Sequence, residues 1–296
     1  MTDTPVPHSA GWRMKLSLFA LCASIFCVLW FMVAALGTKF GVWPWQVGLG
    51  QMTIGVGPMI AMIALGIALI AQIASLIKAP RTQPFILALI ATLLAAFCML
   101  RLVGMGAQAS ALPPIHDIQT DWDHPIQFSA ALMAARTGDG DTNPVLDAPT
   151  VKAAAESRWP GTSGRLVSEI QEEAESQGET GDTVYPPLRS IYFSQSPTAL
   201  AGAVETLIQQ RGWDILTAAP AQDNGDATVQ IEATATSGWF GFKDDIAIRL
   251  TLQDGVTRVD MRSISRVGLS DLGANSKRVY GFMSELQDRA DGRLAP

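Results

Sequence analysis

The sequence predicts a membrane protein with three N-terminal transmembrane helices and an extracytoplasmic α+β domain, an antiparallel sheet with two helices on one face. Hydrophobic residues make up 48% of the 296 residues and charged residues only 16%, which is very apolar for a soluble protein. Residues 1–110 hold one acidic and six basic residues, a net charge of +5, whereas residues 111–296 hold 26 acidic and 15 basic ones, a net charge of −11. The second range also alternates apolar and polar residues as strands do. These two ranges are the predicted domains.

Three apolar runs, at about 16–37, 53–77 and 84–105, are each long enough for a helix that crosses a bilayer. Basic residues flank these runs unevenly. Two precede the first run, two lie between the second and third, and one lies between the first and second: Arg13, Lys15, Lys78, Arg81 and Lys39. By the positive-inside rule, the N-terminus and the second loop are cytoplasmic and everything after the third helix is outside.

The composition also excludes several classes of function. An acidic domain argues against nucleic acid as a partner, because phosphate contacts need a cationic surface. No predicted membrane helix carries Asp, Glu, Lys or His at mid-depth, so a proton relay or ion path has no candidate residues. All three cysteines lie in the apolar runs, which leaves the acidic domain without thiol chemistry. No P-loop, nucleophile elbow or zinc-binding helix motif is present, so we expect no cofactor and assign no catalytic residue.

The acidic domain is expected to begin at residue 111, and Pro113 and Pro114 should end the third helix. A loop-rich insertion follows at about 138–183, where Gly, Asp, Glu, Ser and Pro are frequent. One helix is expected inside it, at about 163–177, with an acidic face in solvent. The insertion therefore separates the membrane part from the folded core.

The core of the domain is predicted from alternation and helical spacing. Ser196 before Pro197 is a good N-cap for the first core helix. The final helix carries four apolar residues at helical spacing, Val279, Phe282, Met283 and Leu286. The elements before it are a strand, a helix and three strands, at 189–194, 197–212, 228–236, 244–252 and 257–265.

An Asp-Gly pair at 254–255 predicts a two-residue hairpin between the last two strands. This turn places Asp244 opposite Ser265 at the end of the sheet. It also places Arg249 opposite Asp260, and we expect that ion pair to be exposed on a polar face. Charges on this face are therefore explained by pairing across strands and do not require catalysis.

The strongest candidate site lies where the last strand leads into the last helix. Gly268 and Gly273 allow the backbone to turn there, and the free N–H groups of the new helix favour an anion. One interpretation is a pocket in which the basic residues bind a phosphate or carboxylate. The other is a buried network that locks the junction, with Asp244, Asp245 and Asp271 neutralising the arginines. The candidate site residues are Asp244, Arg262, Arg266, Ser270, Asp271, Asn275, Lys277 and Arg278.

Two further segments carry residues that are frequent in functional sites. Residues 116–124 hold two His and three Asp, which are acceptable metal ligands, but their spacing matches no metal motif, so no metal is predicted. Trp239, Phe240 and Phe242 stand in a loop between two strands. These aromatic rings either reach the lipid head groups, bind a partner, or fold back over the edge of the core.

Several stretches of the acidic domain resemble a known family. They are Ile115-His-Asp-Ile, Tyr185-Pro, Gly212-Trp213, FKDDIAIRL at 242–250 and VDMRSISRVGLSDLGANSKRV at 259–279. From about 113 to 290 the chain resembles the uncharacterised bacterial family called domain of unknown function 1499. It departs from the family at Pro187, where an Asp is expected, and the pattern fits poorly at 138–183. The resemblance implies a cell-envelope or membrane-associated setting and no established reaction.

These observations lead to one main hypothesis and two alternatives. The main hypothesis is a non-catalytic protein of the bacterial inner membrane, whose periplasmic domain binds an anionic envelope ligand, such as a lipid, or a protein partner. One alternative is an envelope enzyme that uses Asp244, Asp271 and the neighbouring arginines in general acid–base chemistry. The other is a purely structural, membrane-anchored interaction module. The oligomeric state is left open.

Overall fold

The computed structural model describes residues 11–177, 185–220 and 228–290. Within them the chain forms two compact units, the apolar helices and the domain that follows, and each is described by itself. Residues 1–10, 178–184, 221–227 and 291–296, which include part of the predicted insertion, lie outside the described residues.

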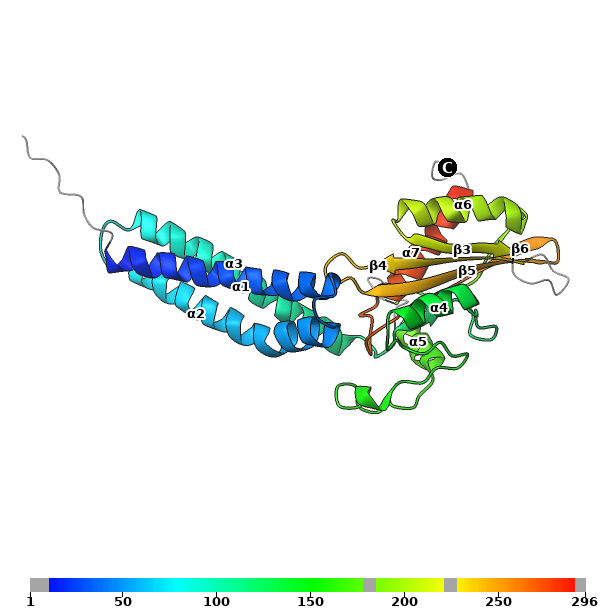
Figure 1. Cartoon of the computed structure of the whole chain (residues 1–296), viewed down its shortest axis with the longest axis horizontal. Helices are drawn as coiled ribbons and strands as arrows, with labels where there is room; N and C mark the ends of the chain where they lie inside the picture. Colours follow the sequence, from blue (N-terminus) through cyan, green and yellow to red (C-terminus); the bar gives the residue numbers. More distant parts are fainter. Residues whose placement is uncertain (1–10, 178–184, 221–227, 291–296) are drawn as a thin grey trace, which may run out of the picture. The chain divides into compact units, whose positions relative to one another are not determined.

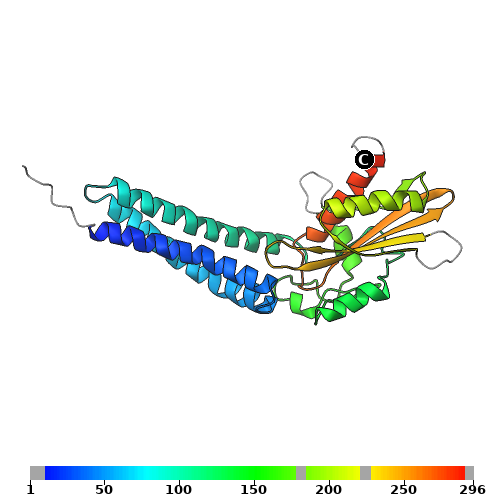
Figure 2. The ribbon, with the colours of Figure 1, turned by 45° about the horizontal axis from the view of Figure 1, so that its top comes forward.

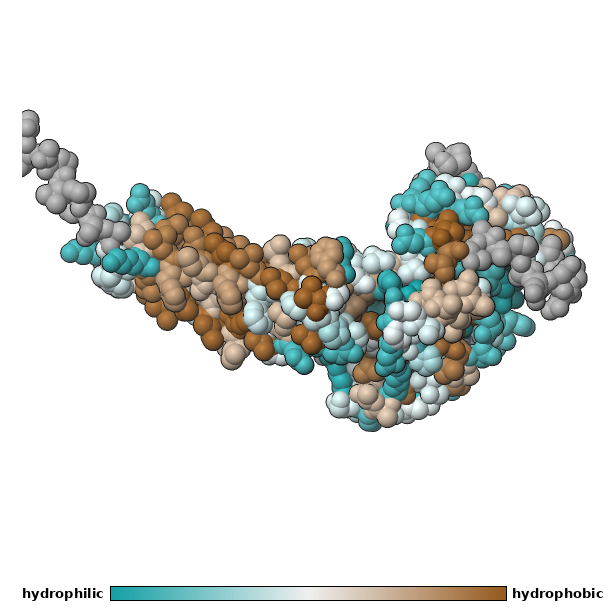
Figure 3. Space-filling view, in the orientation of Figure 1, coloured by the Kyte–Doolittle hydropathy of each residue, from teal (hydrophilic) through white to brown (hydrophobic). Residues whose placement is uncertain are grey.

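The first unit consists of three long apolar helices (Figure 1). They are α1 (Trp12–Lys39), the π-helix η1 (Gln46–Val56) that continues as α2 (Gly57–Ser75), and α3 (Thr82–Ala111). With η1 and α2 counted together, they have 28, 30 and 30 residues, and each is long and apolar enough to span a membrane, as predicted. Their outer surface is apolar over most of its length (Figure 3). The first and third helices extend beyond their predicted runs at both ends, whereas the second begins earlier than predicted, at Gln46, and ends at Ser75, two residues short of the predicted end.

Small residues fill the contacts among these helices. Gly57 lies so close to the ring of Phe31 that an added Cβ atom would come within 2.6 Å of it. Close approach of this kind is what holds helices together in lipid, where apolar burial gives no driving force. Two buried clusters result, one of Ala20, Ala68, Ala71, Ala88 and Ala91, and one of Cys27, Ala61, Ala64, Ala95 and Cys98.

The second unit is built on one antiparallel sheet. Its strands are β1 (Asp117–Gln119), β2 (Ile191–Phe193), β3 (Asp214–Pro220), β4 (Thr228–Thr236), β5 (Lys243–Gln253) and β6 (Val256–Ser265). Their order is β1-β6-β5-β4-β3, and β2 also pairs with β6. The predicted hairpin is confirmed: Asp254 and Gly255 both have positive φ, and Asp244 lies opposite Ser265. Strands β1 and β3 were not predicted.

Two helices cover one face of this sheet, as predicted (Figures 1 and 2). Helix α6 (Pro197–Gln210) packs on β3, β4 and β5, and helix α7 (Ala274–Ala290) packs on β1, β2 and β6. The Ser196 hydroxyl accepts the Ala199 N–H at 3.3 Å and caps α6. Apolar side chains from these helices and strands form a single core beneath them.

The opposite face of the sheet is also covered, which the sequence did not predict. Helix α4 (Ala130–Gly138) lies on this side and contacts β3 (Figures 1 and 2), whereas helix α5 (Val167–Ser176) contacts the edge strand β1 and adds Val167 and Ile170 to the apolar core. Helix α5 is the helix predicted inside the insertion, and it starts later than expected because an isolated bridge joins Thr150 to Leu166. The polar face of the sheet is therefore buried.

Candidate functional site

The predicted site lies at the corner, residues 263–278, where β6 ends and α7 begins. Asn275 lies at its centre and is fully buried. Its amide nitrogen donates to the Ser265 hydroxyl at 2.9 Å and to the His116 carbonyl at 3.0 Å. Its amide oxygen accepts the Ser263 hydroxyl at 2.7 Å. One side chain thus joins the last strand, the last helix and the chain segment that precedes β1.

Asp271 caps the first turn of α7. Its carboxylate accepts the backbone N–H groups of Gly273 at 2.8 Å and of Asn275 at 3.0 Å. Leu272 and Gly273 have positive φ, 54° and 79°, and the former is unusual for leucine. Burial raises the pKa of Asp271 to about 6, although both N–H donors act in the opposite direction. The helix N-terminus that could have bound an external anion is occupied by this carboxylate.

Three of the predicted site residues hold the linker, residues 112–116, which connects α3 to β1. Each of them donates a hydrogen bond to a different backbone carbonyl of the linker. The bonds run from Ser270 Oγ to Pro113 at 3.0 Å, from the Asp271 N–H to Ile115 at 3.1 Å, and from Asn275 Nδ2 to His116 at 3.0 Å. These side chains and backbone groups therefore bind another part of the same chain.

Arg278 completes the corner from the second turn of α7. Its guanidinium pairs with the Asp244 carboxylate at 2.6 Å, and both side chains are largely buried, with 15% and 14% exposed. It also donates to the Ser263 hydroxyl at 3.0 Å and lies over the ring of Trp213. Five of the eight predicted residues are thus brought together: Asp244, Ser270, Asp271, Asn275 and Arg278.

The other three predicted residues are not part of this cluster. Arg262 and Arg266 point to the opposite, polar face of the sheet, because side chains alternate along β6. Arg262 forms two hydrogen bonds with Asp117, at 3.0 and 2.6 Å, and both side chains are fully buried. Arg266 forms two with Asp245, at 2.9 and 2.7 Å. Lys277 is exposed. The expected gathering of all the basic residues at one corner does not occur.

Buried charges continue across the polar face. Arg136 on α4 is 2% exposed and pairs with Asp245, which it shares with Arg266. Glu232 on β4 is fully buried and accepts the backbone N–H of Ser129 at 2.6 Å, together with its hydroxyl. Helix α4 is therefore attached to the sheet through a buried ion pair and hydrogen bonds.

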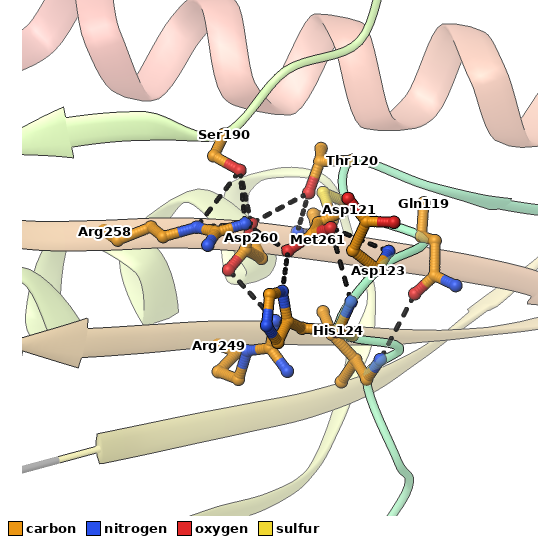
Figure 4. A network of polar contacts seen from close by, with 11 residues as sticks. Gln119, Thr120, Asp121, Asp123, His124, Ser190, Arg249, Arg258, Asp260 and Met261 are labelled. Atoms are coloured by element: carbon orange, nitrogen blue, oxygen red, sulfur yellow. Dashed lines mark hydrogen bonds and ion pairs between the residues drawn. The ribbon is translucent and has the colours of Figure 1, made fainter. Parts of the chain in front are cut away.

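A second network lies further along the polar face (Figure 4). Asp260 on β6 lies between Arg249 and Arg258, 3.1 Å from each, and accepts the Ser190 hydroxyl at 2.6 Å. Arg258 also pairs with Asp121, which follows β1. The predicted register of Arg249 and Asp260 is confirmed, but the expectation that the pair is exposed is wrong. The Asp260 side chain is only 2% exposed because the segment after β1 covers this face.

Two of the three acidic residues at 116–124 take part in these networks. Asp117 binds Arg262, and Asp121 binds both Arg258 and His124, the latter at 3.1 Å. Among the described residues, no group of three or more His, Cys, Asp and Glu side chains is arranged to hold a metal ion. Burial lowers the pKa of His116, which favours its neutral form at neutral pH.

The charges of the corner and of the polar face compensate one another. Each of the six arginines of the corner and the polar face has at least one carboxylate partner within 4 Å: Arg136, Arg249, Arg258, Arg262, Arg266 and Arg278. Such pairing leaves little free positive charge for an external phosphate or carboxylate. The contacts favour the second interpretation of the sequence, a network that locks the junction of strand and helix.

The comparisons agree with this description of the domain. A family model described as "Protein of unknown function (DUF1499)" matches residues 117–286, more than half of the chain. No curated protein and no solved structure matches the chain. The match covers the sheet from β1 to β6, the corner and most of α7. The chain therefore belongs to the DUF1499 family of proteins of unknown function.

Proposed function

We propose that the chain is a non-catalytic, membrane-anchored module of the bacterial cell envelope that binds a protein partner. The three helices would hold it in the inner membrane with the N-terminus in the cytoplasm, since basic residues flank the helices mainly on that side. The acidic domain would then lie in the periplasm. The corner would serve to fix this domain to the end of its membrane anchor, not to bind a ligand.

The observation that carries the proposal is the use of the corner by the chain itself. Ser270, Asp271 and Asn275 donate to the linker, Asp271 caps α7, and Arg278 is neutralised by Asp244. A site for an anionic ligand would need donors and positive charge that are free to receive it. An anchored domain whose corner donors are already engaged by its own chain fits an interaction module better than an anion-binding protein.

Anion binding is tested by thermal unfolding of the purified full chain in detergent, with inorganic phosphate, citrate or an anionic phospholipid added. A ligand present at 100 times its Kd stabilises a fold by about 2.7 kcal/mol. We expect none of the three probes to raise the Tm. A rise that is lost in Arg278→Ala and kept in Lys277→Ala would contradict the proposal, because both variants remove one positive charge but only Arg278 belongs to the corner.

Mass spectrometry of the intact complex, isolated from its native membrane, tests the partner. We expect a protein bound in fixed ratio, and we expect it to remain bound to Lys277→Ala. An anionic lipid bound in fixed ratio, without a protein, would instead support the ligand hypothesis. Purification of the chain alone, with neither, would reject the interaction module.

One observation favours the enzyme alternative. Burial raises the pKa of Asp271 to about 6, and a carboxyl group that titrates near neutral pH suits general acid–base catalysis. Both carboxylate oxygens are, however, engaged by backbone N–H groups. An enzyme would lose its cellular activity in Asp271→Asn, whereas the module we propose keeps its partner in that variant.

A further inference from the structure

We propose that the loop between β4 and β5, residues 237–242, forms a second contact with the bilayer, through insertion of Trp239 into the lipid headgroup layer. Trp239 is 63% exposed, although it is a large aromatic side chain in a folded domain. Tryptophan is enriched at membrane interfaces because its ring is apolar and its N–H group is polar. The position of the loop at one end of the sheet supports a lipid surface, and not a protein, as what Trp239 contacts.

The loop leaves the sheet at the same end as the corner. Asp244, the second residue of β5, pairs with Ser265, and the Arg266 N–H donates to the Lys243 carbonyl at 2.9 Å. The Ser237 N–H donates to the Phe242 carbonyl at 2.8 Å and closes the loop at its base. Its tip therefore projects beyond the last paired residues of the sheet, at the end that holds the linker.

The linker keeps this end of the domain close to the end of α3. Helix α3 ends at Ala111, and the carbonyl of Pro113, two residues later, accepts the Ser270 hydroxyl at 3.0 Å. Since a residue spans at most about 3.6 Å, Ser270 lies within about 10 Å of the end of α3. The 30 residues of α3 measure about 45 Å, close to the thickness of a bilayer with its head groups. If α3 spans the bilayer, the end of the sheet that carries Trp239 would lie within reach of the headgroup layer.

The other end of the sheet gives a matched control. The Asp254-Gly255 turn lies at the opposite end of β5, an 11-residue strand, about 34 Å from the aromatic loop. Val256 beside this turn is also an exposed apolar residue, 38% exposed. A lipid contact should include Trp239 and exclude Val256, whereas nonspecific attraction of apolar residues to lipid would include both.

The test uses the full chain in phosphatidylcholine nanodiscs, with Cys22, Cys27 and Cys98 replaced by Ala. A polarity-sensitive fluorophore is attached at Trp239→Cys, or at Val256→Cys as the control. A third variant, Gly238→Cys, keeps Trp239, and a Cβ atom at Gly238 would meet open space. We expect a blue shift of the emission at positions 239 and 238, and quenching by lipids that carry a nitroxide near the head group. The label at position 256 should show neither.

An aqueous emission at both 238 and 239, without quenching by the nitroxide lipids, would overturn the proposal. A blue shift that appears only after other membrane proteins are added would also overturn it, in favour of a protein contact at the loop. Quenching of the label at 256 to the same extent as at 239 would show that the whole domain lies on the lipid, which contradicts a specific loop contact. Retention of the thermal unfolding profile in all three variants ensures that each outcome refers to the folded domain.

Discussion

Arg262 is the residue on which the polar face depends most. It is fully buried, forms two hydrogen bonds with Asp117, and donates to the backbone carbonyls of Ile126 and Leu146 at 2.8 and 2.7 Å. Its guanidinium also lies near the rings of two aromatic residues. A buried ion pair gains little net free energy when both partners are present, but loss of one partner leaves an uncompensated buried charge.

We therefore expect Arg262→Ala to lower the free energy of unfolding by about 3–5 kcal/mol. The double variant Arg262→Ala with Asp117→Ala should recover part of this loss, because the unpaired carboxylate is then gone. Denaturant unfolding of the purified chain measures both effects. Arg165→Ala is the control, since its pair with Glu173 is exposed and its removal should change stability little. Equal losses for Arg262 and Arg165 would contradict the importance of burial.

Asp271 is expected to make the stability of the folded domain depend on pH. Its pKa is raised by burial from 3.8 to about 6, with a further increase from Asp244 and an opposing effect of Arg278 and of the two N–H donors. The folded state thus binds this proton more tightly than the unfolded state. The stabilisation from protonation is complete below about pH 4 and is lost as the pH rises through 6.

Relative to Asp271→Asn, the wild-type chain should gain stability on the order of 2 kcal/mol as the pH falls from 7 to 4. Denaturant unfolding at several pH values measures the difference between the two proteins, which removes the effects of all other titrating groups. Asp123→Asn, at an exposed position, should run parallel to the wild type. A wild-type advantage that grows with rising pH would show that the sign is wrong.

Contacts between residues on neighbouring strands could be predicted from the sequence, whereas contacts between residues far apart along the chain could not. The Asp254-Gly255 turn fixes the pairing of Asp244 with Ser265, because both lie on neighbouring strands. Side chains alternate along β6, so the sequence also contained the information that Arg262 and Arg266 lie on the opposite face of the sheet from Ser263 and Ser265. Their partners were out of reach: Asp117 lies in a three-residue strand, and Arg136 comes from a helix that was not recognised.

At the scale of elements, long periodic segments were predictable and short ones were not. Helix α6 and strands β4, β5 and β6 each show many repeats of their pattern. Strand β1 has only three residues, and β3 contains an irregular register between Ile215 and Thr217, which breaks its alternation. Helix α4 had a usable signal, since the Ser129 hydroxyl accepts the Leu132 N–H as an N-cap. These three elements cover the polar face or extend the sheet to its edges.

The contact between the corner and the linker can be tested with two neighbouring residues of α7. Asn275→Ala removes hydrogen bonds to His116, Ser265 and Ser263, and leaves buried polar groups unpaired, which costs about 1–3 kcal/mol for each group. Ser276 is equally buried, and its hydroxyl has no hydrogen-bond partner among the described residues. Ser276→Ala should therefore be neutral or slightly stabilising.

Hydrogen exchange of a peptide that covers residues 112–119 provides the second measurement. Asn275→Ala should speed exchange in this linker peptide more than in the distant β5–β6 hairpin, whereas Ser276→Ala should change neither. A uniform increase in Asn275→Ala would indicate general destabilisation and would contradict the specific attachment of the linker.

For the whole molecule, the distribution of charge between residues 1–110 and 111–296 predicts the orientation of the chain in a membrane. Three spans place the two ends of the chain on opposite sides of a membrane. Two basic pairs, Arg13 with Lys15 and Lys78 with Arg81, favour the cytoplasm, whereas the first loop has only Lys39. Acidic residues have little influence on orientation, so the net charge of −11 in residues 111–296 does not oppose transfer of the domain across the membrane.

Alkaline phosphatase fusions test this orientation, because the enzyme is active only outside the cytoplasm. We expect activity when it is fused after Gly41 in the first loop or after residue 296, and none when it is fused after Pro80 in the second loop. Replacing both Lys78 and Arg81 by Gln removes two of the four cytoplasmic charges, and it should yield a mixed population because the remaining bias is only two against one. Activity after Pro80 together with inactivity after residue 296 would invert the topology, and the domain would then be cytoplasmic.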